Sequence, residues 1–160
     1  MAAHTKHVEM ILATRLASIN RAEKASLRVA AEAGFGDDDC HKISMAVREG
    51  VINAFQYGNR QSKEKKIHVV FDVTPEKLIV HVTDEGNGFK LASVPNPLEE
   101  ENLLKTSGRG IFLMRALMDE LDVRQGTTGG AEIVLSKTLP GVRGSGAPRN
   151  GNRPARLKGR

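Results

Sequence analysis

The sequence predicts one α/β (α+β) domain, and three features of the chain indicate it. Two long stretches, 16–33 and 37–59, repeat apolar or small residues at the helical spacing of three and four. Residues 67–84 hold two runs rich in β-branched residues around a short turn, which is typical of an antiparallel hairpin. A further apolar helix is predicted directly after Gly108-Arg109-Gly110. At 160 residues the chain is long enough to bury one core.

Charge divides the chain into a domain, expected at 1–140, and a basic Gly/Pro/Arg-rich tail at 141–160 that is expected to be disordered. The whole chain carries +5, of which the last twenty residues contribute +6 and no acid, leaving −1 for the rest. The body therefore gives no support to a nucleic-acid-binding surface. For the tail two interpretations stay open, a solubilising extension or a weak electrostatic contact with nucleic acid or an acidic partner.

Cysteine usage and hydropathy indicate a cytoplasmic protein without membrane contact. The single cysteine, Cys40, excludes an internal disulfide framework, as expected in a reducing compartment. No apolar run approaches the roughly 20 residues of a membrane span. Glu9 and Arg15 interrupt the apolar stretch near the N-terminus, which argues against a signal peptide. The five histidines are scattered, so we expect them to be surface or core residues rather than metal ligands.

The first part of the chain predicts a strand and two helices. Residues 7–14 form a short apolar run that favours a strand, although a run of this length is ambiguous. Residues 16–33 are rich in good helix formers, and Gly34 is a typical helix end. Asp37–Asp39 favour the start of the next helix because acidic residues complement the helix dipole there. We expect that helix to end near Gly58–Asn59.

This second helix carries the polar pair on which the functional interpretation depends. Glu49 and Asn53 are four residues apart, so they lie one turn apart at the edge of the apolar arc. A carboxylate can accept a proton from a hydroxyl or water that attacks a phosphate, and an amide oxygen can bind Mg²⁺. The helix alone also fits an ordinary polar rim. The arc comprises Ile43, Ala46, Val47, Gly50, Val51, Ala54 and Tyr57.

The second part of the chain predicts four strands, one loop and one helix. Residues 86–107 have no regular pattern, and because glycine signatures bracket them we favour a lid over a disordered loop. Residues 110–121 predict an apolar helix. The first two strands form an antiparallel hairpin through the tight turn 74–76, and the last two flank a turn at 127–130. The predicted strands are 67–73, 77–84, 122–126 and 131–139.

Two glycine signatures flank the loop. Asp84 ends a strand and is followed by Gly86 and Gly88 at DxGxG spacing. Glycine lets backbone approach a flat ligand, and an aspartate at a strand end can accept a hydrogen bond from an exocyclic amine such as that of adenine. Residues 107–110 (SGRG) precede the apolar helix, where backbone N–H groups at a helix N-terminus can bind phosphate. Each signature is weak alone, and neither is a P-loop or a Rossmann fingerprint.

Taken in order, these features resemble the GHKL ATP-binding superfamily, and more closely the single-domain anti-sigma factor serine kinases of bacterial stress and sporulation switches. The resemblance covers about residues 5–139 and rests on the stretches AVREGVINAFQYGN, VTDEGNGF, SGRGIFLMRALMDEL and GGAEIVLSK. It implies a two-layer sandwich of the Bergerat type, with helices on one face of a mixed, mostly antiparallel sheet.

The resemblance also implies a site. Glu49 would be the catalytic base, Asn53 the Mg²⁺ ligand and Asp84 the residue that reads adenine, with ATP and Mg²⁺ as cofactors. For Arg109, a contact with the γ-phosphate and a solvated position are equally open. Ala131 stands where many relatives carry a threonine near the adenine, so one polar contact to the base is in doubt. The other nucleotide-binding residues implied are Gly86, Gly88, Phe89, Ser107, Gly108 and Gly110.

The activity that the resemblance implies is a protein serine/threonine kinase that phosphorylates a STAS-type anti-sigma factor antagonist and sequesters a sigma factor. One alternative is a histidine-kinase-type ATP-binding module acting in trans, since no dimerisation hairpin is expected before the first strand. Another is a non-catalytic partner-binding module whose shape is set by nucleotide, which the presence of Glu49 and Asn53 disfavours. A homodimer stays open. Met45 and Ile52 project away from the apolar arc, either toward a partner or into a second packing contact.

Overall fold

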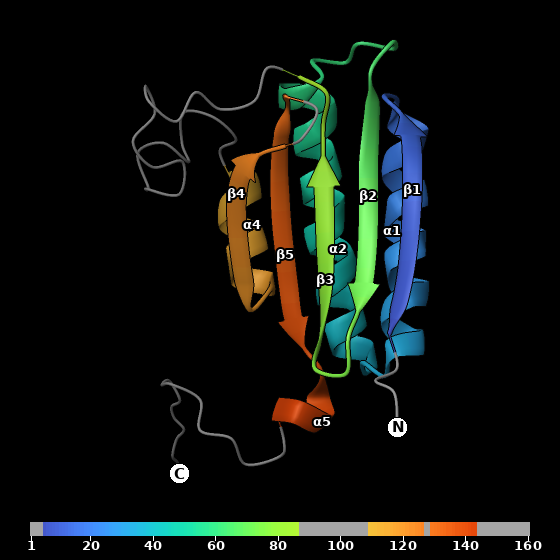
Figure 1. The fold of residues 1–160 in the computed structure, drawn as a ribbon, viewed down its shortest axis with the longest axis vertical. Coiled ribbons are helices and arrows are strands. Elements are labelled where there is room, and N and C mark those ends of the chain that lie inside the picture. Colours follow the sequence, from blue (N-terminus) through green and yellow to red (C-terminus); the bar gives the residue numbers. More distant parts are fainter. Residues whose placement is uncertain (1–4, 87–108, 127–128, 144–160) are drawn as a thin grey trace.

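The computed structural model describes residues 5–86, 109–126 and 129–143, which form a five-stranded sheet covered by helices (Figure 1). The strand order is β1-β2-β3-β5-β4. The elements are β1 Lys6–Ala13, α1 Leu16–Ala33, α2 Asp37–Asn53, a π-helical turn η1 Ala54–Gly58, β2 Lys66–Val73, β3 Lys77–Thr83, α4 Arg109–Leu117, β4 Glu120–Gln125, β5 Ala131–Thr138 and α5 Pro140–Arg143. None of the described helices is long and apolar enough to cross a lipid bilayer.

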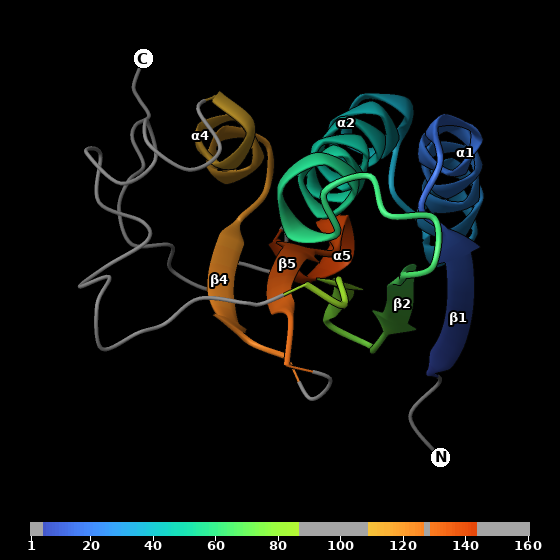
Figure 2. The ribbon, with the colours of Figure 1, turned by 90° about the horizontal axis from the view of Figure 1, so that it is seen from above.

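The expected two-layer arrangement with helices on one face of the sheet is confirmed. Seen from above, α1, α2 and α4 form one layer and the strands form the other (Figure 2). All pairings among the described strands are antiparallel, so in this part of the chain the sheet is antiparallel rather than mixed as expected.

Period-two alternation explains the hairpin of β2 and β3. Every second residue of both strands is buried beneath the helices. The register places Val69 opposite Val82 and Phe71 opposite Val80, so buried side chains align in rows across the sheet. A slip by one residue would turn these rows toward solvent, which fixes the register. The predicted hairpin is confirmed, with strand bounds within one residue of the expectation.

The outer face of the sheet carries histidines that are paired with carboxylates. His7 contacts Asp72 across the β1–β2 pair, and His81 Nδ1 lies 2.9 Å from a carboxylate oxygen of Glu132. On β2, His68 Nε2 lies 2.9 Å from Glu85 Oε2. These three residues are therefore surface histidines, as expected for side chains on the solvent face of a one-sided sheet.

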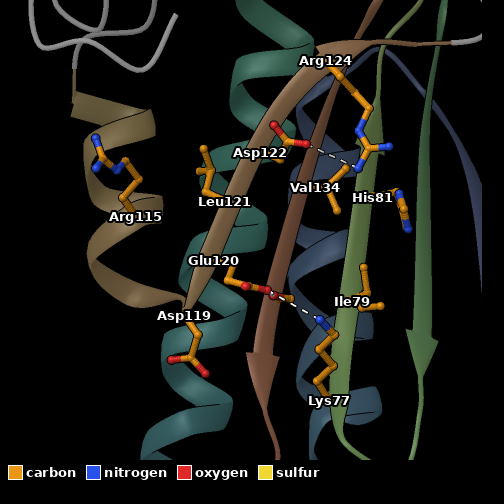
Figure 3. Close-up of a pocket in the computed structure, with 11 residues that line it drawn as sticks. Lys77, Ile79, His81, Arg115, Asp119, Glu120, Leu121, Asp122, Arg124 and Val134 are labelled. Atoms are coloured by element: carbon orange, nitrogen blue, oxygen red, sulfur yellow. Dashed lines mark hydrogen bonds and ion pairs between the residues drawn. The ribbon is translucent and has the colours of Figure 1, made fainter. Parts of the chain in front are cut away.

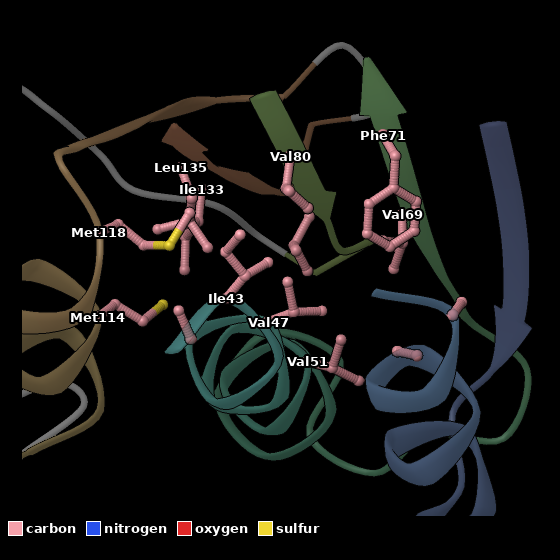
Figure 4. Packing of buried hydrophobic residues seen from close by; sticks show 14 of the residues in the cluster. Ile43, Val47, Val51, Val69, Phe71, Val80, Met114, Met118, Ile133 and Leu135 are labelled. Carbon is pink, nitrogen blue, oxygen red and sulfur yellow. The ribbon is translucent and has the colours of Figure 1, made fainter. Parts of the chain in front are cut away.

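Helix α2 packs over the middle of the sheet and forms the centre of the core. Ile43, Val47 and Val51 are fully buried and face the apolar side of the strands (Figure 4). Met114 of α4 closes the same core from the side. Ile52 also packs against this core, which favours the packing interpretation of its position over a partner contact.

The apolar arc predicted for this helix is correct except at its end. Tyr57 is 52% exposed rather than buried. The cause is the π-helical turn, in which the N–H of Asn59 donates to Ala54 O at 2.7 Å. This wider turn shifts the helical phase beyond Ala54, so the spacing of three and four no longer points inward.

Two boundaries near the C-terminus differ from the prediction. Helix α4 ends at Leu117 rather than 121, and β4 starts at Glu120 rather than 122. The sheet edge causes both shifts, because the N–H of Asp119 donates to Ser136 O on β5 at 3.0 Å. The expectation of disorder from residue 141 is wrong for residues 141–143, which belong to α5. Residues 144–160 and most of the expected lid lie outside the described residues.

Gly50 should tolerate a methyl group. A Cβ on Gly50 would lie 3.4 Å from Val82 Cγ2 and 3.6 Å from Met114 Sδ, which are ordinary contact distances. We expect Gly50→Ala to raise the free energy of unfolding by up to about 1 kcal/mol, because glycine inside a helix is disfavoured. Urea denaturation measures the change. Gly50→Leu is the matched control and should destabilise, since its larger side chain must displace Val82. A destabilised Gly50→Ala would contradict this packing.

Candidate functional site

The two polar side chains of α2 converge on the start of α4. Glu49 and Asn53 are half-buried and lie one turn apart at the C-terminal end of α2. A Cβ on Gly110 would lie 3.5 Å from both Glu49 Oε1 and Asn53 Oδ1. Both oxygens therefore face the first turn of α4, and Gly110 leaves space in front of them.

This juxtaposition combines two kinds of binding group. The first N–H groups of a helix have no partner inside the helix and favour an anion. The Glu49 and Asn53 oxygens instead favour a cation or a proton donor. A phosphate group that carries Mg²⁺ would satisfy both requirements at once, and the Asn53 amide oxygen is the group that could hold the metal. The described residues contain no cluster of three or more His, Cys, Asp or Glu side chains suited to a metal.

Asp84 forms the second part of the site. It follows β3 and is 5% exposed. Its Oδ1 accepts the N–H of Gly86 at 2.9 Å and the N–H of Ala131 at 3.0 Å. Burial raises the pKa of the Asp84 carboxyl, and these two backbone donors offset part of that effect. The carboxyl group is therefore held in one orientation at the end of the strand.

Three glycines allow the backbone to approach Asp84 closely. A Cβ on Gly58 would lie 2.0 Å from Asp84 Oδ2, and one on Gly130 would lie 2.1 Å from Asp84 O. A Cβ on Gly86 would lie 2.0 Å from Gly58 O. A side chain at any of the three would collide with its neighbour. The end of the α2–η1 helix, the turn after β3 and the start of β5 thus meet at this carboxyl group.

The helix that carries Glu49 and Asn53 also reaches Asp84. It continues through the π-helical turn to Gly58, which contacts the Asp84 side chain. Nine residues separate Glu49 from Gly58, or about 13 Å along the helix axis at the usual rise. One rigid element therefore joins the α4 end of the site to the Asp84 end, a separation on the scale of a nucleotide.

Several predicted residues cannot be placed. Gly88, Phe89, Ser107 and Gly108 lie outside the described residues. Arg109 starts α4, and both interpretations of its side chain stay open. Sequence reasoning missed Gly58 and Gly130, which it assigned to a helix end and a turn. Glycine marks such positions in a sequence, but only the fold shows what approaches them.

A hollow of about 750 Å³ lies elsewhere, across the outer side of β3, β5 and β4 (Figure 3). It contains none of the predicted site residues. Charged side chains along it are already paired, with Lys77 Nζ 3.6 Å from Glu120 Oε1 and Arg124 NH2 3.5 Å from Asp122 Oδ2. Glu49, Asn53 and Gly110 lie instead on the helices that cover the sheet, and we assign no role to this hollow.

Comparisons with known proteins agree with the fold. A family model described as the histidine kinase-like ATPase domain matches residues 12–137. The serine-protein kinase RsbW of Bacillus subtilis (strain 168) is 30% identical over 121 residues, which cover 72% of this chain and 74% of RsbW. RsbW of Listeria innocua is 27% identical over 117 residues, covering 69% and 73%.

The fold is also similar to a solved structure, that of the RsbU and RsbW domains of Rv1364c from Mycobacterium tuberculosis. The TM-score is 0.61 at 19% identity, and the match covers 84% of this chain and 33% of that one. At this identity the likeness concerns the fold alone.

The burial of Asp84 should be visible in the pH dependence of stability. Because the pKa of the folded carboxyl is raised above its ordinary value of 3.8, the stability supplied by the protonated form is present below that value. It is lost as the pH rises through the folded pKa. As the pH rises through the folded pKa of Asp84, the free energy of unfolding of wild type should therefore fall relative to that of Asp84→Asn. The asparagine side chain keeps the Oδ1 acceptor but carries no charge. Urea denaturation from about pH 4 to about pH 7 measures the difference.

An exposed carboxylate provides the control for this comparison. Asp122 is 65% exposed on the outer side of β4, and Asp122→Asn should not reproduce the relative change. The burial of a charged carboxylate at this position would be contradicted if the difference in free energy of unfolding between wild type and Asp84→Asn did not change with pH.

Proposed function

This chain belongs to the family of histidine kinase-like ATPase domains, and from that premise we propose that it is an ATP-dependent protein serine/threonine kinase. The observation that carries the proposal is the convergence of Glu49 Oε1 and Asn53 Oδ1 on Gly110 at the start of α4. Its relatives in Bacillus subtilis and Listeria innocua are named serine-protein kinases, which supports the same reaction.

ATP is proposed to lie along α2, with its base at Asp84 and its phosphates at the N-terminus of α4. The buried Asp84 carboxylate accepts a hydrogen bond from the exocyclic amine of adenine. Gly86 is proposed to line the base pocket beside Asp84. Gly110 leaves space for the phosphates in front of Glu49 and Asn53. Asn53 would hold Mg²⁺ through its amide oxygen, where the bound metal would supply positive charge to the phosphate oxygens.

Glu49 is the proposed general base. Its carboxylate takes the proton of a substrate serine hydroxyl as the serine oxygen bonds to the γ-phosphorus. The bond from the γ-phosphorus to the β–γ bridging oxygen breaks, and ADP leaves. Glu49 is borne by a helix anchored in the core, which holds the base in a fixed position relative to the α4 N-terminus.

For the acceptor, we propose a serine of a STAS-type anti-sigma factor antagonist. The same chain would sequester a sigma factor in the cytoplasm when the antagonist is unable to compete. The resemblance of the motifs to anti-sigma factor serine kinases supports this role, and the family match is consistent with it. A homodimer would fit the same regulatory arrangement.

Glu49→Gln separates the chemical step from binding. Transfer of radiolabelled phosphate from ATP to the antagonist should fall by about a hundredfold or more, because the proton acceptor is lost. The affinity for ATP should stay within about threefold of wild type, since the side chain keeps its shape. Glu64→Gln, at an exposed loop position, is the matched control and should leave both quantities unchanged.

The chemical nature of the label decides between the alternatives. Label that is stable to acid on a serine of the antagonist agrees with the proposal. Acid-labile label would instead indicate a histidine-kinase-type module acting in trans. If the protein binds ATP but transfers phosphate to no acceptor, the kinase proposal is rejected, and the alternative of a non-catalytic partner-binding module set by nucleotide is supported.

A further inference from the structure

Asn59 is a buried polar residue that follows the π-helical turn directly. Asn59 is 1% exposed. Its Nδ2 donates to Thr14 Oγ1 at 2.7 Å and to Lys66 O at 2.9 Å. Its Oδ1 accepts the N–H of Glu85 at 2.8 Å. One amide therefore connects the end of β1, the start of β2 and the turn after β3.

These bonds close into a ring around the Asp84 turn. Asn59 Nδ2 donates to the carbonyl of Lys66, and the N–H of Lys66 donates to Glu85 Oε1 at 3.0 Å. The N–H of Glu85 then donates to Asn59 Oδ1, which closes the ring. His68 holds the other carboxylate oxygen of Glu85 at 2.9 Å, and this contact lowers the pKa of Glu85. The ring fixes Glu85 through its backbone and through its side chain.

Glu85 is the residue between Asp84 and Gly86, so the ring acts directly on the candidate base-reading group. Gly86 supplies one of the two N–H groups that orient Asp84 Oδ1, and it rests on Gly58 O. Gly58 in turn precedes Asn59. Without the Asn59 amide, the backbone of Glu85 loses its acceptor, and the turn that aims the Asp84 carboxylate is held from one side only.

We propose that Asn59 is a positioning residue that sets the selectivity of the site for a 6-amino purine. It does not touch the base but holds the Asp84 carboxylate, through Glu85 and Gly86, in the direction that accepts the exocyclic amine. A purine with a 6-oxo group presents an acceptor to this carboxylate and is rejected. The inference rests on the proposed nucleotide site and deepens it.

The test compares the affinities for ATP and ITP, measured by calorimetry on the full chain with Mg²⁺. In wild type, ATP should bind more tightly. Asn59→Ala should reduce the ratio of ATP to ITP affinity by about tenfold, because a charge-assisted hydrogen bond is lost for ATP and none for ITP. Asn59→Ser, whose hydroxyl is too short to reach the Glu85 N–H, is the second variant in case Asn59→Ala does not fold.

Thr14→Val is the matched control. It removes the Thr14 contact of Asn59 and the Thr14 bond to Lys65 O, but leaves the bond from Glu85 to Asn59 intact. It should lower the free energy of unfolding while keeping the ATP-to-ITP ratio within about twofold of wild type. If the Asn59 variants lose stability and keep the wild-type ratio, Asn59 is structural only and the inference is overturned.

The readout is independent of phosphoryl transfer. A wild type that prefers ATP but transfers nothing would reject the kinase and leave this inference standing. A wild type that binds ATP and ITP equally would overturn the inference whatever the kinase assay gives.

Discussion

The packing of α2 against the middle of the sheet is the contact on which the rest of the structure depends. Ile43, Val47 and Val51 are fully buried there, and each contributes about 1.5–3 kcal/mol by leaving water. Both ends of the candidate site are attached to this helix. Glu49 and Asn53 face α4 from its last turns, and Gly58 reaches Asp84 through the π-helical turn. Because Asp84 follows β3, a shift of α2 along the sheet would change the distance from Glu49 and Asn53 to Asp84. The packing of α2 therefore fixes the spacing between the two parts of the candidate site.

Several locally unfavourable features coincide at Asp84. The carboxyl group is buried and its pKa is raised, the adjoining helix ends in a rare π-helical turn, and three glycines bring backbone into direct contact. Each of these costs stability in isolation. Their concentration at one point, while the surrounding core is regular, is typical of functional sites rather than of structural accidents. The closed hydrogen-bond ring of Asn59, Lys66 and Glu85 compensates by satisfying the polar groups that the arrangement buries.

Local patterns in the sequence were sufficient for the regular elements. The bounds of α1 match the prediction, because apolar periodicity and Gly34 both act within the segment itself. The boundary between α4 and β4 could not be predicted, since Asp119 leaves the helix to pair with β5, far along the chain. The spacing of Glu49 and Asn53 placed them on one side of their helix, but their convergence on Gly110 required the fold. Asn59 gave no usable pattern, because its partners come from three separate segments.

The strand order has a consequence for synthesis of the chain. β5 lies between β3 and β4, so the last strand of the described sheet fills an interior position. Until residue 131 has left the ribosome, the nascent chain has an open gap beside β3 and Asp84 lacks one of its two backbone donors. The strand that completes the interior of the sheet thus also supplies the Ala131 N–H that orients the Asp84 carboxyl group. A translation product that ends before residue 131 would lack both this strand and this donor.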